Sequence, residues 1–200
     1  VGIVGTNTLE WCAGAIGALK AGAVVAAYNH RFVAHELAHL ITDSEPTLVL
    51  AGAEHVRIVD DAASTATGSF GRLPLAEVAA LRTGPERPFP RVEVDPDSPA
   101  VLIYTSGTTS LPKGVIFTHR TIFAFILEWR LMEPALHQGT RLEFVLSLGG
   151  APGILWGLLH MLIHGGQFYL EVGFDPKATL QRLSEEKIDV FLGVPFRIEQ

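Results

Sequence analysis

Residues 101–119 read VLIYTSGTTSLPKGVIFTH, and this stretch decides both the fold class and where a functional site is sought. It opens with four apolar residues, which are typical of a buried strand. Six small residues follow at 105–110, and five of them carry a hydroxyl group. Pro112 then stiffens the turn, and Lys113 adds a positive charge. Backbone N–H groups, hydroxyl groups and a lysine in one tight turn are suited to hold a polyphosphate.

The nearest general phosphate-binding motif is the Walker P-loop, G-x-x-x-x-G-K-[ST], and the stretch departs from it twice. Counted from Gly107, Pro112 stands where the second glycine belongs, and Gly114 stands where the magnesium-binding hydroxyl belongs. A kinase-like or GTPase-like loop is therefore not expected. If only the composition of residues 105–113 is considered, a Ser/Thr-rich surface turn with an exposed lysine is the alternative to a phosphate-binding loop.

Short apolar segments alternate with helical patterns on both sides of this stretch. Such alternation predicts an α/β fold in which parallel sheets are flanked by helices. Pro176 after Asp175 is a strong helix start, and Asn7 with Glu10 three residues later matches a capping box. We expect strands at 1–4, 24–27, 47–50, 101–104, 144–148, 168–170 and 190–192, and helices at about 8–21, 34–44, 75–81, 119–132, 154–164 and 176–186.

The chain divides into two α/β blocks with a Pro-, Gly-, Ser- and Thr-rich segment between them. Residues 1–61 form the first block, and residues 100–200 form the second, which includes the phosphate loop at 104–114. Residues 62–99 are expected to be an irregular surface excursion with one short helix.

Composition narrows the classes of protein. Nearly half of the residues are hydrophobic (48%) and 18% are charged, which favours a substantial core over disorder. The net charge is −6 without a basic run, so neither nucleic acid nor an anionic membrane is an expected partner. The single cysteine, Cys12, excludes an internal disulfide. We expect no transmembrane segment and a cytoplasmic location.

The segment YTSGTTSLPKGVIFTH at 104–119 closely resembles the phosphate-binding signature of the adenylate-forming superfamily, which includes acyl-CoA synthetases. Within the signature only Ser110 departs, because glycine is usual there. The resemblance covers nearly the whole chain: GALKAGAV at 17–24, NHRF at 29–32, Gly165-Gly166, FDP at 174–176 and Val194-Pro195 resemble further landmarks of the family.

The resemblance implies that the chain is part of the large N-terminal domain of such an enzyme, with the C-terminal part and the mobile domain absent. It also implies activation of a carboxylic acid by ATP with release of pyrophosphate, then transfer to CoA, with Mg²⁺ accompanying the nucleotide. By this resemblance Lys113 stabilises charge and Gly114 shapes the loop. The phosphate-binding residues would be Thr105, Ser106, Gly107, Thr108, Thr109, Ser110, Lys113 and Gly114. We expect residues 1–200 alone to be inactive as a ligase, and the sequence does not indicate an oligomeric state.

One departure concerns the acyl substrate. These ligases often carry an aromatic-His-x-x-Gly motif near the carboxylate end of the acid. Counted back from Gly153, the aromatic and His positions fall on Gly149 and Gly150. Either another side chain replaces the imidazole or the acyl entrance is wider, so the two glycines are candidate pocket residues.

Two other functions stay open at this point. His35-Glu36-Leu37-Ala38-His39 matches H-E-x-x-H, whose two histidines could bind zinc in a peptidase. A third ligand at the spacing of known zinc peptidases is missing, and metal analysis would decide the question. The other alternative is a nucleotide-binding module without catalytic activity.

Overall fold

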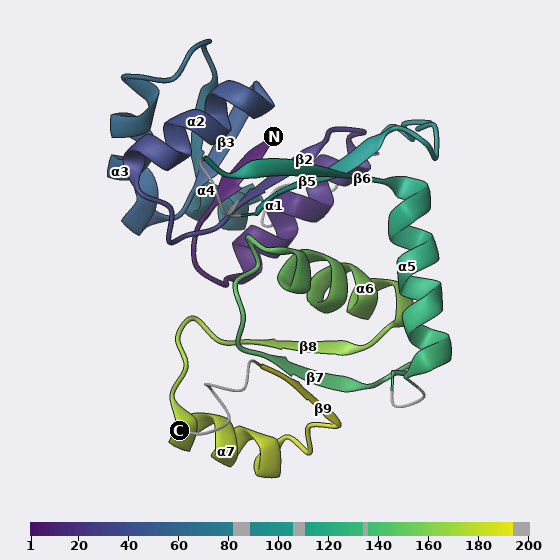
Figure 1. Ribbon diagram of the computed structural model, residues 1–200. Coiled ribbons are helices and arrows are strands. Elements are labelled where there is room, and N and C mark those ends of the chain that lie inside the picture. Colours follow the sequence, from purple (N-terminus) through teal and green to yellow (C-terminus); the bar gives the residue numbers. More distant parts are fainter. Residues whose placement is uncertain (82–88, 106–110, 134–135, 194–200) are drawn as a thin grey trace.

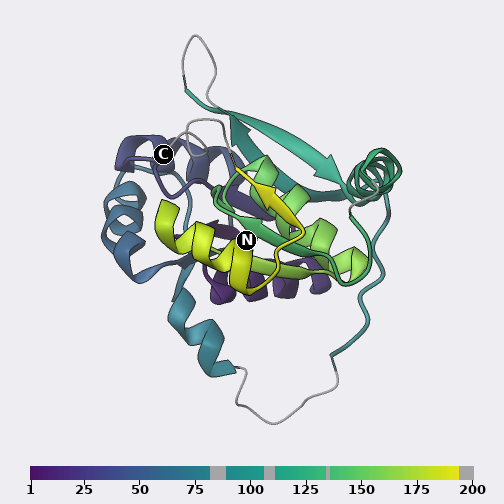
Figure 2. The same ribbon diagram turned by 90° about the horizontal axis from the view of Figure 1, so that it is seen from below.

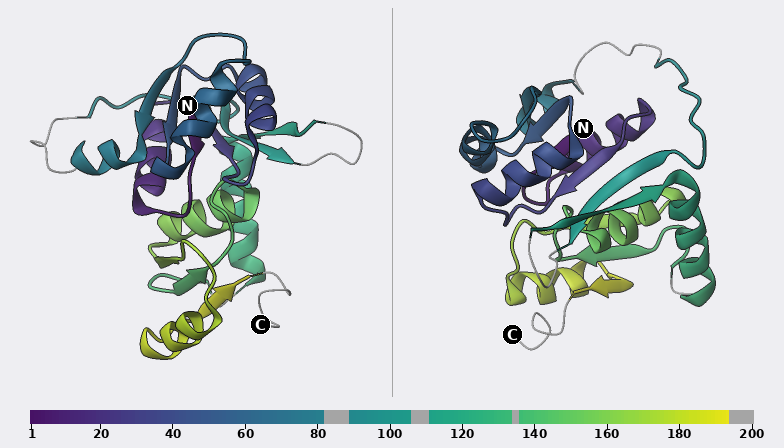
Figure 3. Two further views of the ribbon diagram at one scale, coloured as in Figure 1. Left: turned by 90° about the vertical axis from the view of Figure 1, so that its left-hand side faces the viewer. Right: turned by 45° about the horizontal axis from the view of Figure 1, so that its top comes forward.

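The computed structural model describes residues 1–81, 89–105, 111–133 and 136–193, and it contains two stacked β-sheets (Figure 1). Helices lie between the sheets and on their outer faces, which confirms the predicted α/β fold with parallel strands (Figure 3). No helix within these ranges is long and apolar enough to cross a membrane.

The first sheet contains six strands: β1 (Gly2–Val4), β2 (Val25–Tyr28), β3 (Leu48–Ala51), β4 (Gly71–Pro74), β5 (Pro99–Thr105) and β6 (Lys113–Thr118). Their order across the sheet is β4-β3-β1-β2-β5-β6.

Helices cover both faces of the first sheet because its connections run in opposite directions. The chain moves from β1 to β2 through α1 (Leu9–Lys20), and from β2 back across β1 to β3 through α2 (Ala34–Ser44). Right-handed crossovers in opposite directions place the two helices on opposite faces. One core therefore contains Trp11 of α1 with Ile3, and the other contains Leu37 of α2 with Val4. The remaining helices of this part are η1 (Ala53–His55), α3 (Val56–Ala63) and α4 (Leu75–Leu81).

The two edges of the first sheet differ from the sequence prediction. β6 runs antiparallel to β5, where we expected only a loop before the next helix. β4 pairs with β3 inside the segment 62–99, which we expected to be irregular apart from the helix that α4 now provides. Both edge strands are largely exposed, and neither has the run of four or more apolar residues that marks a buried strand.

The start of α1 also differs from the prediction. Thr8, and not Asn7, is the N-cap, because its Oγ1 accepts the N–H of Trp11 at 3.2 Å. Asn7 is therefore free for a different role, described below.

The second sheet is wholly parallel and has the order β8-β7-β9, with β7 (Arg141–Phe144), β8 (Gln167–Leu170) and β9 (Val190–Leu192). β7 ends at Phe144, where we expected the strand to begin. Glu143 within β7 is completely buried, and a buried charge interrupts the apolar pattern from which the strand was predicted. The helix α7 (Pro176–Glu185) covers the outer face of this sheet (Figure 2).

An apolar helical segment fills the space between the sheets. It consists of the π-helical η2 (Pro152–Leu159) and α6 (His160–His164), close to the predicted helix. Gly157 allows this segment to approach β8, since a Cβ there would lie 2.7 Å from the ring of Phe168. The helix α5 (His119–Met132) closes one side, where the rings of Trp129 and Trp156 are 5.0 Å apart. The layer belongs to the same core as α1.

The carboxyl groups of Glu143 and Glu171 connect the second sheet to α7. Arg182 donates hydrogen bonds to Oε1 of Glu143 at 2.9 Å and to Oε1 of Glu171 at 2.7 Å. One cation thus serves two buried acids. Burial and the neighbouring carboxyl of Glu171 raise the pKa of Glu143 to about 7. Near pH 7 Glu143 is therefore protonated part of the time, and the two carboxyl groups together carry less than two negative charges. The smaller charge lowers the free-energy cost of burying them.

The side-chain amide of Asn7 joins the two sheets. Its Nδ2 donates to the carbonyl of Leu146 at 2.6 Å and to that of Glu171 at 3.0 Å. Its Oδ1 accepts the N–H of Leu148 at 2.9 Å. The segment after β1 is thereby fixed to the segments after β7 and β8 through one buried side chain. Backbone groups thus accept both hydrogens of the Asn7 amide and occupy one of the two lone pairs on Oδ1.

Replacing Asn7 with Ala tests this connection. Each buried polar group left without a partner costs about 1–3 kcal/mol, so we expect the free energy of unfolding to fall by at least about 2 kcal/mol. Urea denaturation of the full-length product of the gene would measure the change. Asn29→Ala is the matched control, because Asn29 is only half-buried and its Oδ1 accepts one local hydrogen bond. Equal stability of the two variants would contradict the connecting role of Asn7.

Candidate active site

The predicted phosphate loop connects β5 to β6. At its base Thr105 pairs with Lys113 and Tyr104 pairs with Gly114. Thr105, Lys113 and Gly114 are all exposed. The structure therefore brings these three predicted site residues together where the hairpin begins. Five further predicted residues lie outside the described residues: Ser106, Gly107, Thr108, Thr109 and Ser110.

Two contacts attach this hairpin to α2. Nε2 of His39 lies 3.1 Å from the carbonyl oxygen of Pro112, and the hydroxyl of Tyr104 donates to Oδ2 of Asp43 at 2.7 Å. Burial and the bond to Asp43 raise the pKa of Tyr104, so this hydroxyl stays protonated as a donor. Each strand next to the loop is thus held near the same helix. Neither His39 nor Asp43 belongs to the loop motif, so their supporting role could not be predicted from the sequence.

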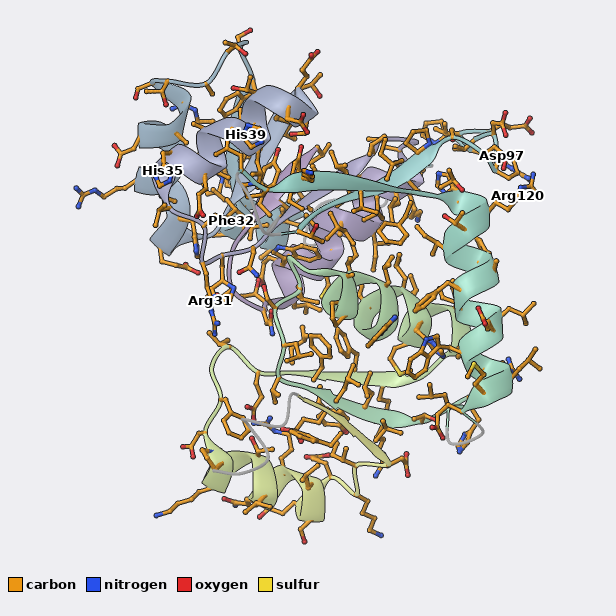
Figure 4. The ribbon with its side chains drawn as sticks, viewed as in Figure 1. Arg31, Phe32, His35, His39, Asp97 and Arg120 are labelled. Atoms are coloured by element: carbon orange, nitrogen blue, oxygen red, sulfur yellow. The ribbon has the colours of Figure 1, made fainter. Side chains whose placement is uncertain are left out.

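The same geometry bears on the H-E-x-x-H hypothesis. His39 and His35 both lie on α2, and His35 is exposed (Figure 4). Oε2 of Glu36 accepts the N–H of Val33 at 3.0 Å, which caps the start of the helix. Across the described ranges there is no group of three or more His, Cys, Asp or Glu side chains able to hold a metal ion. Glu36 and His39 therefore have structural partners, which favours a structural role for this motif over a zinc site.

Gly149 and Gly150 differ sharply in their surroundings. A Cβ at Gly149 would lie 2.6 Å from the carbonyl carbon of Tyr28 and 2.8 Å from Cα of Asn29, so the backbone after β7 packs directly on the end of β2. A Cβ at Gly150 would have its nearest neighbours at 3.7 and 3.8 Å, which are ordinary contacts. Of the two predicted pocket positions, only residue 150 has space for a side chain.

The chain belongs to the AMP-binding enzyme family, whose model matches residues 1–199. A feruloyl-CoA synthase of Amycolatopsis sp is 32% identical over 180 residues, which cover 88% of this chain and 34% of that protein. The long-chain-fatty-acid–CoA ligase FadD13 of Mycobacterium tuberculosis is 33% identical over 135 residues, covering 64% of this chain and 26% of that protein. The chain thus spans about a third or less of the length of these relatives.

Solved structures agree with this assignment. The N-terminal domain of FACL13 from Mycobacterium tuberculosis, in an inhibitor-bound structure, superposes with a TM-score of 0.87 at 26% identity, covering 99% of this chain and 50% of that one. ATP-bound MatB from Rhodopseudomonas palustris has a TM-score of 0.82 at 24% identity, covering 98% and 39%, and supports the fold alone. The fold is that of the N-terminal part of adenylate-forming enzymes.

The two glycines give a paired prediction. Gly149→Ala forces the backbone against Tyr28 and should destabilise the protein by about 1–3 kcal/mol, the usual cost of overpacking. Gly150→Ala should change the stability by less than about 0.5 kcal/mol, as is usual for a site with space. Denaturant unfolding of both variants measures the difference. Loss of stability in the Gly150 variant alone would show that the assignments are reversed.

Proposed function

We propose that the protein to which this chain belongs activates a carboxylic acid with ATP, forming an acyl-adenylate and pyrophosphate, and then transfers the acyl group to the thiol of CoA. The observation that carries this proposal is the β5–β6 hairpin, with Thr105 and Lys113 paired at the base of a loop rich in hydroxyl groups. Membership of the AMP-binding family and the CoA-ligase names of several relatives support it.

In the first step the carboxylate attacks the α-phosphate, and the bond from the α-phosphate to the bridging oxygen of pyrophosphate breaks. An anion thereby attacks an anion, so the reaction requires positive charge and hydrogen-bond donors around the phosphates. Lys113 would supply charge near the departing pyrophosphate. The loop from Thr105 to Ser110 would supply hydroxyl and N–H donors to the β- and γ-phosphates. Mg²⁺ would neutralise further phosphate charge, and we assign no residue as its ligand.

Positioning matters as much as charge, because donors stabilise a transition state only when they are already in place. In this hairpin the contacts His39–Pro112 and Tyr104–Asp43 would limit the movement of the two strands that carry the loop.

In the second step the thiol of CoA attacks the acyl carbon of the adenylate and AMP leaves. The CoA acceptor is proposed from the relatives and not from a site within the described residues. A nucleotide-binding module without catalysis would bind ATP but release no pyrophosphate.

Lys113→Ala in the full-length product should slow adenylate formation. Loss of one charge-assisted interaction of about 1.5–3 kcal/mol predicts a rate decrease of roughly ten- to a hundredfold. ATP–pyrophosphate exchange across a panel of carboxylic acids measures it, and Lys177→Ala is a charge-matched control on exposed α7. An exchange rate equal to that of the control would remove Lys113 from the mechanism.

Gly150→His should narrow the range of accepted acids, because residue 150 has space for a side chain and stands where relatives often carry histidine. The same panel, measured as the ratio of kcat/KM values between small and bulky acids, tests this expectation. Gly150→Ala serves as the control for loss of glycine alone. Identical acid profiles in all three proteins would show that residue 150 does not border the acyl entrance.

A further inference from the structure

Two carboxyl groups are buried between the second sheet and α7, and they share one cation. Nη1 of Arg182 donates to Oε1 of both Glu143 and Glu171. The side chain of Glu143 is completely buried, and that of Glu171 is 4% exposed. If both carboxyl groups were ionised, the cluster would hold two negative charges and one positive charge. An uncompensated buried charge is costly, so one unit of negative charge is left to be neutralised.

The second oxygen of each carboxyl group lacks a donor. Oε2 of Glu143 and Oε2 of Glu171 are both buried, and neither has a hydrogen-bond partner among the described residues. The two carboxyl groups are nevertheless close enough to form a hydrogen bond with each other. Two carboxylates cannot form that bond because both only accept, whereas a protonated carboxyl group donates one hydrogen. A single proton would therefore supply the missing donor and remove the excess charge.

The other titratable groups on this face of the sheet interact elsewhere. Arg141 of β7 donates to the carbonyl of Glu186, and its backbone N–H donates to the carboxylate of Asp189. Tyr169 of β8 donates its hydroxyl hydrogen to Glu186. The strand β9 contributes no titratable side chain. Within the described part of the chain, Arg182 is thus the only cation that interacts with the carboxyl pair.

Of the two acids, Glu143 is better placed to hold the proton. Oε1 of Glu171 accepts two hydrogen bonds, from Arg182 and from Thr179 at 3.1 Å, whereas Oε1 of Glu143 accepts one. Hydrogen bonds to a carboxylate favour its ionised form. Burial and the hydrogen bond with Glu171 raise the pKa of Glu143 to about 7, against the opposing effect of Arg182. Glu171 then carries the negative charge that Arg182 balances.

We propose that Glu143 and Glu171 hold one shared proton below neutral pH and release it above, so that the attachment of α7 to the second sheet depends on pH. Release leaves one excess negative charge and two facing acceptors without a donor. The effect arises beside the junction of the two sheets, because the backbone carbonyl of Glu171 accepts the amide of Asn7 at 3.0 Å. The proton site is independent of the proposed ligase activity.

The direction of the pH dependence follows from the protons bound in each state. The pKa of Glu143 is raised from an ordinary value of 4.5 to about 7 in the folded protein. Between these two values the folded protein binds more protons than the unfolded chain, so stability falls as the pH rises. The stabilisation is fully present below the ordinary pKa and is lost as the pH rises through the raised one.

Urea denaturation of the full-length product between pH 5 and pH 8 tests the proposal. Glu143→Gln keeps the shape of the side chain and carries a permanent N–H donor, so it imitates the protonated acid at every pH. We expect similar midpoints for wild type and variant at pH 5, and a more stable variant at pH 8. The unfolding constant of the wild type relative to that of the variant should rise about tenfold or more over this range.

Glu186→Gln is the matched control, because Glu186 is an exposed carboxylate on the same face of the sheet. This variant should keep the pH dependence of the wild type. A difference in stability between wild type and Glu143→Gln that is equal at pH 5 and pH 8 would overturn the proposal.

Infrared spectroscopy of the folded wild-type protein gives a second measurement, which needs neither unfolding nor a stable variant. The C=O stretch of a protonated carboxyl group is resolved from the stretches of a carboxylate. We expect this band at pH 6 and its loss by pH 8. Absence of the band at pH 6 would show that the pair holds no proton and would contradict the proposal.

Discussion

The amide of Asn7 is the interaction on which the arrangement of the two sheets depends. It is buried where the ends of β1, β7 and β8 meet, and it binds three backbone groups from segments about 140 and 164 residues away in the chain. Backbone groups buried without partners are costly, so loops can meet in a core only if a side chain satisfies them. The amide provides both a donor and an acceptor, and this need explains why helix α1 is capped by Thr8 instead.

Fixing the two sheets at this point has consequences for the surface beside it. Gly149 then packs on Tyr28, and Ser147 comes within hydrogen-bonding distance of His30. The strand ends of both sheets are brought to one cavity, which Arg31 and His30 line.

In helix α2 one sequence pattern is compatible with two different roles, a zinc site and a structural helix. H-E-x-x-H has the spacing of a zinc site, yet Glu36 caps its own helix and His39 contacts the carbonyl of Pro112. The apolar positions of the same helix, including Leu37 and Ile41, are completely buried against the first sheet. That burial orients the helix, and the orientation places its polar side chains His39 and Asp43 beside the β5–β6 hairpin.

The family, the α/β fold and the position of the loop between β5 and the next helix could be predicted from the sequence, because apolar periodicity and a contiguous loop motif are local properties of the chain. It could not identify β6 as an antiparallel edge strand or β4 as a partner of β3, since exposed edges carry little periodic signal. The three-dimensional arrangement was needed to find that Gly149 is packed while Gly150 has space, that Asn7 connects the two sheets, and that Arg31 and His30 line one cavity. These facts depend on contacts between residues distant in sequence, and neither composition nor spacing records such contacts.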